Sequence, residues 1–283
     1  YRQEAGYDML RSEVNLGSAV EDLQRQMAMS NEVCIVGSNT TGVAPTSTDE
    51  CVLKAPTGII SYEPDELMIS VFAGTSIAEI NIELQNAKQR IVVPEWGTIG
   101  GAIATRRNGL RDSHHLTLPN NVLRCTVIAA DGSLYQGGGQ VVKNVSGFDL
   151  VKLVVGSWGL LGLIVEVTMR TEPTPEFSQW VHSFDLTATD QICNLYRPAA
   201  VTQINGATYV LLEGHEQDVR QEISQLNGFT MCEMPELNQS TQRANLDRLS
   251  HNLPHSIERS IRKQFDPSNK LNKHIATQRD LLT

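Results

Sequence analysis

Apolar residues recur with two different periods along the chain, so both helices and strands are expected. A spacing of three to four residues predicts one helix over Ala19–Ala28. A second helix is predicted after Ser76, because Ser76 and Glu79 have the spacing of a capping box. The polar residues 1–15 before the first helix are expected to lack regular structure.

Short β-branched runs predict strands between and after these helices. Val33–Val36 and Ile91–Val93 are two such runs. Residues 163–170 alternate between two faces and predict a longer strand, with Val165 on the same face as Val167. Strands and helices are therefore interleaved in this part of the chain.

The pattern changes after a segment that contains two prolines, Glu172–Glu176, which predicts a linker. Beyond it we expect a strand, a short helix, a hairpin that turns at Asn205-Gly206, and an amphipathic helix. Two further helices are predicted over Ser240–Leu253 and Ser256–Phe265. This order is typical of a small α+β unit followed by a helical tail.

Glycine is concentrated in one stretch, Pro94–Arg170, which holds 12 of the 21 glycines. Ten of these 12 form three clusters, at Pro94–Ala104, Gly137–Asp149 and Gly156–Arg170, and each cluster abuts an apolar run. Glycine lets backbone N–H groups approach a large anionic ligand closely, at a cost in conformational entropy. The clusters contain neither the G-x-G-x-x-G of a Rossmann fold nor a P-loop, so both of these nucleotide-binding folds are excluded.

Composition narrows the class of protein further. The net charge of −9 argues against nucleic acid as a partner. The apolar, uncharged stretch Leu153–Val165 has 13 residues and is too short to span a bilayer. No secretory signal pattern is visible, and the five cysteines lack the spacing of a metal or iron–sulfur motif, so we expect reduced thiols in the cytoplasm.

The order of the motifs resembles the FAD-binding PCMH-type domain of the vanillyl-alcohol oxidase / p-cresol methylhydroxylase family. Within this family the chain looks most like the GlcE-type branch of the glycolate oxidases. The motifs that carry the resemblance are VFAGTSIAEI (71–80), GTIGGAIAT (97–105), GGQVVKNVSGFDLVKLVVGSWGLLG (138–162) and FDPSNKLN (265–272). The resemblance is weak from residue 176 to about residue 252.

The resemblance implies an α+β fold, with a two-subdomain FAD-binding domain, a small α+β cap, and a C-terminal segment that returns to the FAD domain. We expect the FAD domain over residues 1–173, with subdomains of about 15–60 and 61–173. A reduced cap is expected over residues 176–252. The C-terminal helix and tail, residues 253–283, are expected to pack on the FAD domain.

FAD is the cofactor that the resemblance and the loop chemistry together imply. The segment Gly37–Gly42 occupies the position of the first phosphate-binding loop of the family. It is more polar and poorer in glycine than is usual there, and it contains no His, so we expect non-covalent FAD. Asn272 is expected to form a hydrogen bond near the flavin. The expected cofactor-binding residues are Gly37, Ser38, Asn39, Thr40, Pro94, Gly97, Thr98, Ile99, Gly100, Gly101, Ala104, Gly109, Gly159 and Ile164.

Candidates for catalysis are weaker. His114 and His115 lie in a polar loop and are either solvated or an acid/base at the flavin edge. Lys143 either neutralises a phosphate or the reduced flavin, or pairs with Asp149 at the surface. No protein-bound metal is expected, because the cap histidines lack ligand spacing.

Three functions are compatible with this sequence. The first is an FAD-binding subunit of a glycolate oxidase-type complex, which takes electrons from a small 2-hydroxy acid and works with a catalytic flavin subunit and an iron–sulfur subunit. We expect such a complex in the cytoplasm or at the inner membrane through its partners. The second is a self-sufficient FAD-linked dehydrogenase of a small hydroxy acid, with Arg111 among its candidate residues. The third is a scaffold that has lost flavin.

Overall fold

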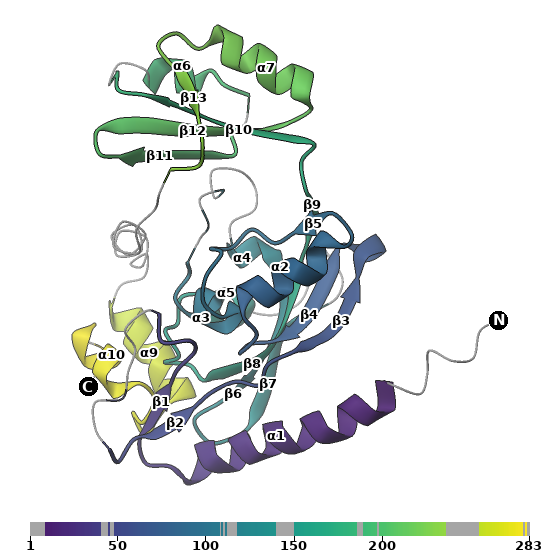
Figure 1. Ribbon diagram of the computed structural model, residues 1–283. Coiled ribbons are helices and arrows are strands. Elements are labelled where there is room, and N and C mark those ends of the chain that lie inside the picture. The colour runs from purple at the N-terminus through teal and green to yellow at the C-terminus, as the bar shows by residue number, and fades with distance from the viewer. Residues whose placement is uncertain are drawn as a thin grey trace, which may run out of the picture.

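The structure, a computed structural model, describes residues 9–40, 45, 48–107, 109, 111, 118–139, 150–185, 189–196, 198–235, 255–279 and 281. In this part of the chain, strands form one five-stranded sheet, one four-stranded sheet and two small two-stranded sheets. Figure 1 shows the four-stranded sheet and its helices set apart at one end of the molecule, joined to a larger body. The expected α+β fold is confirmed.

The body is built on the five-stranded sheet, which is antiparallel throughout. Its strands, in spatial order, are β3 (Ile59–Glu63), β4 (Met68–Phe72), β8 (Leu163–Arg170), β6 (Val122–Ile128) and β7 (Leu134–Gly138). A 3-10 turn, η1 (Pro64–Glu66), connects β3 to β4. The central strand β8 is buried along most of its length because both faces of the sheet are covered.

Helices cover one face of this sheet (Figure 1). They are α2 (Ile77–Gln85), α3 (Ile99–Ala104), α4 (Leu118–Asn121) and α5 (Leu150–Val154). Apolar side chains of these helices form one continuous core with the inner residues of the strands. The predicted cap of α2 is confirmed, since the Glu79 N–H donates to Ser76 Oγ at 3.1 Å.

The opposite face is covered by α1 (Met9–Met29) and by the parallel pair β1 (Val33–Ile35) and β2 (Cys51–Leu53). Met27 and Val33 belong to a second core, on this side of the sheet. The expectation that residues 1–15 lack regular structure is wrong from Met9 onward, where α1 already begins. A helix docked along a sheet can extend beyond the residues whose own pattern predicts it, because packing stabilises it.

Strand β8 differs from the regular alternation that its sequence predicts. Val165 is an extra residue, because Val127 pairs with Ile164 while the neighbouring Thr126 pairs with Glu166. A bulge of this kind reverses which face the following residues occupy. Val165 consequently packs toward α1, whereas Val167 packs toward the helices on the other face.

The connection between the body and the cap is itself a small sheet. The strand predicted at Ile91–Val93 lies earlier, at β5 (Gln89–Arg90), where it pairs with β9 (Glu172–Pro173). The segment predicted as a linker from its prolines therefore begins inside a strand pair. Proline is tolerated there because β9 is short and forms an edge.

The cap is a four-stranded antiparallel sheet with two helices on one face. Its elements are β10 (Phe177–Ser183), α6 (Thr189–Cys193), β11 (Ala200–Ile204), β12 (Ala207–Gly214), α7 (Glu216–Gln225) and β13 (Thr230–Cys232). The predicted hairpin at Asn205-Gly206 is confirmed. Strand β13, at one edge of the sheet, has no counterpart among the predicted elements. The helix predicted at Ser240–Leu253 lies outside the described residues.

The C-terminal segment consists of α9 (His255–Phe265) and α10 (Lys273–Gln278), and it lies against β1 and β2 (Figure 1). Between these helices Leu271 forms a parallel bridge to Val33. None of the described helices combines the length and the apolar character that a membrane span requires.

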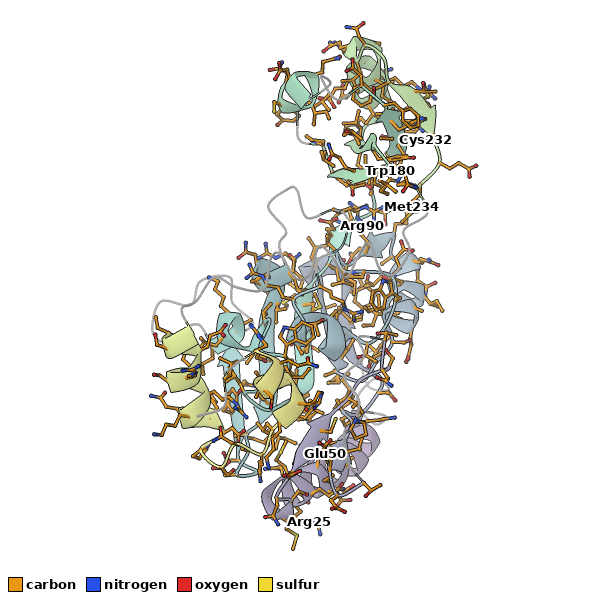
Figure 2. All side chains as sticks on the ribbon, turned by 90° about the vertical axis from the view of Figure 1, so that its left-hand side faces the viewer. Arg25, Glu50, Arg90, Trp180, Cys232 and Met234 are labelled. Carbon is orange, nitrogen blue, oxygen red and sulfur yellow. The ribbon has the colours of Figure 1, made fainter. Side chains whose placement is uncertain are left out.

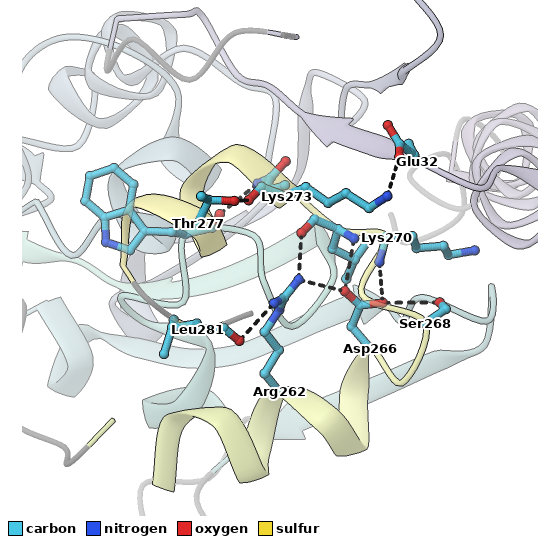
Figure 3. Close-up of polar contacts among 11 residues, drawn as sticks. Glu32, Arg262, Asp266, Ser268, Lys270, Lys273, Thr277 and Leu281 are labelled. Carbon is cyan, nitrogen blue, oxygen red and sulfur yellow. Dashed lines mark hydrogen bonds and ion pairs between the residues drawn. The ribbon is translucent and has the colours of Figure 1, made fainter. Parts of the chain in front are cut away.

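A buried ion pair fixes the turn between α9 and α10 (Figure 3). The Arg262 guanidinium lies 3.3 Å from Asp266 Oδ2 and also donates to the carbonyl oxygens of Leu271 and Leu281. The Asp266 carboxylate accepts from the backbone N–H groups of Lys270 and Leu271. Buried charges are stable only when they are paired and hydrogen-bonded in this way.

Candidate cofactor site

A cavity of about 270 Å³ opens where the first strand pair, the glycine-rich loops and the C-terminal segment meet. Its walls come from β1 and the loop after it, the segment after β2, the end of β4, helix α3, and the turn that leads into β8. The residues that line it are Ile35, Val36, Gly37, Ser38, Asn39, Lys54, Ala55, Thr57, Ala73, Gly74, Thr98, Gly100, Gly101, Ala104, Thr105, Trp158, Gly159, Gly162, Leu163, Ile164 and Asn272.

Nine of the expected cofactor-binding residues line this cavity, although they come from three separate stretches of the chain. They are Gly37, Ser38, Asn39, Thr98, Gly100, Gly101, Ala104, Gly159 and Ile164. The fold thus brings the first phosphate loop and two of the three glycine clusters to one place.

Five expected residues do not line the cavity. Thr40 and Gly97 are neighbours, since a Cβ at Gly97 would be 3.2 Å from Thr40 Oγ1. Pro94 and Gly109 are neighbours in a more distant loop. The Ile99 side chain is fully buried in the core, and its N–H donates to Thr75 O rather than toward the cavity. The backbone N–H of Ile99, one of the expected cofactor-binding residues, is therefore already used inside the protein.

Two glycines show why the loops need this residue type. A Cβ at Gly100 would lie 2.7 Å from Ala73 O, so the first turn of α3 can pack on the end of β4 only without a side chain. Gly159 has a positive φ of 73°, and a Cβ there would lie 2.6 Å from Asn272 Nδ2. Because they lack a side chain, these two glycines allow the segments that form the cavity walls to pack closely against one another.

The loop after β1 contributes three consecutive residues to the cavity wall. Among the described residues, no acceptor pairs with the backbone N–H groups of Gly37, Ser38 and Asn39. Asn39 adopts a positive φ of 55°, which turns the loop back on itself. Successive N–H groups in such a turn form a concave site that suits an anion.

Arg107 is the residue of this region that sequence analysis missed. Its side chain is 2% exposed, and its Nε and Nη1 have no hydrogen-bond partner among the described residues. Its Nη2 lies 2.8 Å from the position that a Cβ of Gly97 would take, and its guanidinium stacks on Trp96 at 4.0 Å. Burial lowers the pKa of Arg107 to about 10, so the side chain is still charged near neutral pH.

A buried arginine without an anion is costly, because a desolvated charge needs compensation. Arg107 lies directly behind the loop that carries Thr98 and Gly101. The sequence contained one signal for it, since Arg106-Arg107 follows the GTIGGAIAT motif at once. An adjacent arginine pair resembles ordinary surface residues when it is read from sequence alone.

Asn272 links the C-terminal segment to the cavity wall. Its Oδ1 accepts from the Ile35 N–H at 2.7 Å, and its Nδ2 donates to Trp158 O at 2.7 Å. The side chain is therefore bonded to two opposite walls of the cavity. Lys54, an exposed cation on a third wall, was not expected as a site residue.

The candidate catalytic residues His114, His115 and Lys143 lie outside the described residues. Arg111, the further candidate, is already engaged, since its Nε donates to Glu213 Oε1 at 2.9 Å. Of the cap histidines, His182 stacks on Tyr209 with ring centroids 5.4 Å apart. The exposed His215 pairs with Glu176 instead. The described part of the cap thus brings no histidines together.

Glu213 in the cap is held by two arginines of the body. Arg90 donates to both carboxylate oxygens, at 2.9 Å and 2.7 Å, and Arg111 donates to one of them. Figure 2 shows Arg90 at the junction between body and cap. Burial alone would raise the pKa of Glu213, but hydrogen bonds and charge from Arg90 and Arg111 outweigh it and lower the pKa.

Comparison with known proteins identifies the class of the body. Residues 17–138 match the family described as an FAD binding domain. This match confirms the resemblance to FAD-binding domains of the PCMH type, and FAD is the cofactor that it indicates. The N–H groups of residues 37–39, which no acceptor of the described residues pairs with, and the buried guanidinium of Arg107 fit a pyrophosphate.

Among individual proteins, the chain is 31% identical over 166 residues to glycolate oxidase subunit GlcE of Escherichia coli (strain K12). That match covers 56% of this chain and 47% of the relative's length. The chain is also 42% identical over 79 residues to a D-lactate dehydrogenase of Archaeoglobus fulgidus, covering 28% of this chain and 18% of the dehydrogenase. The matched part thus spans about half or less of these relatives.

The fold is shared with a solved structure of alkyldihydroxyacetonephosphate synthase in crystal form P1. The TM-score is 0.64 at 12% sequence identity, and the match covers 89% of this chain and 74% of that one. At this level of identity the likeness concerns the fold alone.

Proposed function

We propose that the chain is the FAD-binding subunit of a glycolate oxidase-type complex that oxidises a small 2-hydroxy acid. One observation carries the proposal: a single cavity gathers nine residues that the FAD-binding motifs predict. The match to glycolate oxidase subunit GlcE supports the choice of reaction.

The chain's own residues would bind and orient the cofactor. The N–H groups of Gly37, Ser38 and Asn39 would donate to the pyrophosphate. Arg107, which lies next to Gly97 and Gly101, would neutralise the charge of the pyrophosphate. Asn272 would close the cavity from the C-terminal side. None of the described residues that line the cavity is His, Cys or Tyr, which supports non-covalent FAD.

When bound, the flavin would accept two electrons from the hydroxy acid and pass them on to a partner. A base for the hydroxyl proton and a cation for the carboxylate are also required. The described candidates for these roles are used elsewhere, because His182 stacks on Tyr209, the exposed His215 pairs with Glu176, and Arg111 of the body is committed to Glu213. This favours a role beside a catalytic flavin subunit and an iron–sulfur subunit, in the cytoplasm or at the inner membrane through those partners.

The similarity to D-lactate dehydrogenases supports a second function, a self-sufficient FAD-linked dehydrogenase. His114, His115 and Lys143 would then supply the missing chemistry. A scaffold without flavin is disfavoured by the cavity and by the buried nitrogens of Arg107 that lack a partner among the described residues.

The test is to purify the chain alone, record its visible spectrum and precipitate it with acid. Yellow colour that passes into the supernatant is expected and would show non-covalent FAD. Glycolate and D-lactate are then added anaerobically to the yellow protein. An unchanged spectrum supports the subunit, whereas bleaching supports the self-sufficient dehydrogenase. A protein that stays colourless when FAD is added would overturn both.

A further inference from the structure

A cysteine, a glutamate and a histidine from three distant parts of the sequence meet beside the C-terminal segment. Cys34 lies in β1, Glu50 immediately precedes β2, and His274 lies in α10. The thiol sulfur, a carboxylate oxygen and a ring nitrogen all lie within 4.8 Å of one another. Figure 2 places Glu50 in the lower body, near α1.

His274 is the residue whose surroundings call for an explanation. Both of its ring nitrogens are buried, and neither has a hydrogen-bond partner among the described residues. A buried ring nitrogen without a partner has lost its hydrogen bonds to water and forms none in the protein, which is unfavourable in free energy. An ion that the structure does not contain is one of the ordinary reasons for such a group.

Cys34 and Glu50 complete a set of ligand atoms around this histidine. Cys34 is fully buried, and its thiol forms a hydrogen bond with Glu50. A divalent cation would displace the thiol proton to solvent and would bind the thiolate and the carboxylate together.

We propose that Cys34, Glu50 and His274 bind a divalent cation of the zinc class. Thiolate, imidazole and carboxylate are the ligands that zinc accepts, at about 2.0–2.3 Å. Ligand atoms around a tetrahedral zinc are then about 3.3–3.6 Å apart. Side-chain movements of about 1 Å would therefore close the site, with a fourth position left for water.

The expected role of the cation is structural. It would join α10 to β1 and to the start of β2, segments that are more than 200 residues apart in the sequence. Asn272, which bonds to two walls of the cofactor cavity, lies two residues before His274. None of the three ligands lines that cavity, so the site is separate from the one that holds FAD.

Two other residues serve as matched controls. His182 in the cap also has a buried ring nitrogen without a partner among the described residues. Cys232, also in the cap, is half-buried and free. Neither belongs to a group of side chains that could hold a metal ion in the described part of the chain. His182→Gln and Cys232→Ser therefore change the same residue types without changing the proposed site.

The experiment uses the full chain without an affinity tag. The protein is treated with a chelator, dialysed against Zn²⁺, freed of unbound metal and analysed for zinc by atomic emission. We expect one zinc per chain and a melting temperature about 5 °C or more above that of the chelated protein. Cys34→Ser and His274→Gln should each reduce bound zinc at least tenfold, while His182→Gln and Cys232→Ser retain it.

A second measurement does not depend on whether the variants fold. Adding Co²⁺ to the chelated wild-type chain should produce a near-ultraviolet thiolate-to-cobalt band in the difference spectrum against the same protein without metal. The absence of both zinc and this band would overturn the proposal. So would zinc that is retained in Cys34→Ser and His274→Gln, or that is lost equally from the two cap variants.

Discussion

The body and the cap are both sheets covered by helices, yet they differ in how their buried polar groups are paired. In the body, the backbone donors of Gly37, Ser38 and Asn39, which have no acceptor among the described residues, lie in the cavity wall, and the buried Arg107 guanidinium lies next to Gly101 of the same wall. In the described cap, apolar residues pack on both faces of the sheet, and the charged Glu213 is paired with two arginines of the body. Polar groups without partners inside the protein indicate a ligand, and among the described residues all but one of the buried side-chain nitrogens of this kind lie outside the cap, the exception being His182 Nδ1.

The largest effect is expected from a substitution that disturbs the packing of the cavity walls. Gly100→Ala would place a Cβ 2.7 Å from Ala73 O, and we expect a loss of about 2–3 kcal/mol in unfolding free energy together with loss of bound FAD. Gly17→Ala is the matched control, because nothing lies within 4 Å of a Cβ in that helix. It should be neutral or stabilising by up to about 1 kcal/mol. Urea unfolding and the flavin content of the purified proteins measure both effects.

Arg107→Met separates binding of the cofactor from stability. Removing a charged donor from the pyrophosphate site should weaken FAD binding by about 10–100-fold. The free energy of unfolding of the FAD-free protein should change by less than about 1 kcal/mol, because an unpaired buried charge is itself unfavourable. Fluorescence titration with FAD and urea unfolding give the two values.

The control for this variant is Arg170→Met, at the other end of β8 from the cavity-lining Ile164. It should leave FAD affinity unchanged. If Arg107→Met kept its FAD affinity but lost stability, the guanidinium would be part of the core rather than of the cofactor site.

The junction between body and cap depends on Glu213, whose side chain is 7% exposed. Glu213→Gln removes the charge while keeping the shape, and it takes the anion away from Arg111 while Arg90 keeps its second partner, Glu172. We expect a loss of about 2 kcal/mol, less than for a fully buried pair because both arginines are partly exposed. The cap should also become easier to cleave from the body in limited proteolysis. Unchanged cleavage would show that apolar contacts alone hold the junction.

The same ion pairs should be sensitive to acid. The pKa of Glu213 is lowered in the folded protein, so its contribution to stability is complete above the ordinary value of 4.5. It is lost as the pH falls through the lowered folded pKa. The difference in unfolding free energy between wild type and Glu213→Gln should therefore be constant from pH 7 to about 5 and shrink below about 4.5. Urea unfolding of both proteins across this range gives that difference.

Local sequence signals predicted much of the fold, because they depend on a few neighbouring residues. The cap at Ser76 and the turn at Asn205-Gly206 are two such signals, and both are confirmed. The bulge at Val165 was not predictable, because it depends on the register of β6 against β8. Strand β13 was missed for a similar reason, since its pairing with β10 rather than its own pattern makes it a strand.

The residues that line the cavity were easier to predict from the sequence than Arg107, Cys34 and His274. Glycine and small polar residues at Gly37–Asn39 signal a ligand-binding loop by their type alone. Arg107 gave no such signal, because its lack of a partner is visible only when burial is known. Cys34 and His274 are 240 positions apart, so no spacing motif could connect them.

The smallest effect is expected at the base of the cap, where His215 and Glu176 form an ion pair that is fully open to solvent. The hydrogen bond and charge of Glu176 raise the pKa of His215 above 6.5. Any stabilisation is therefore present below pH 6.5 and lost as the pH rises through the folded pKa. Water and salt screen such a pair, so His215→Gln should shift the melting temperature by less than about 1 °C between about pH 5 and 9. A larger shift, comparable with that of Glu213→Gln, would mean that burial is not what distinguishes the two ion pairs.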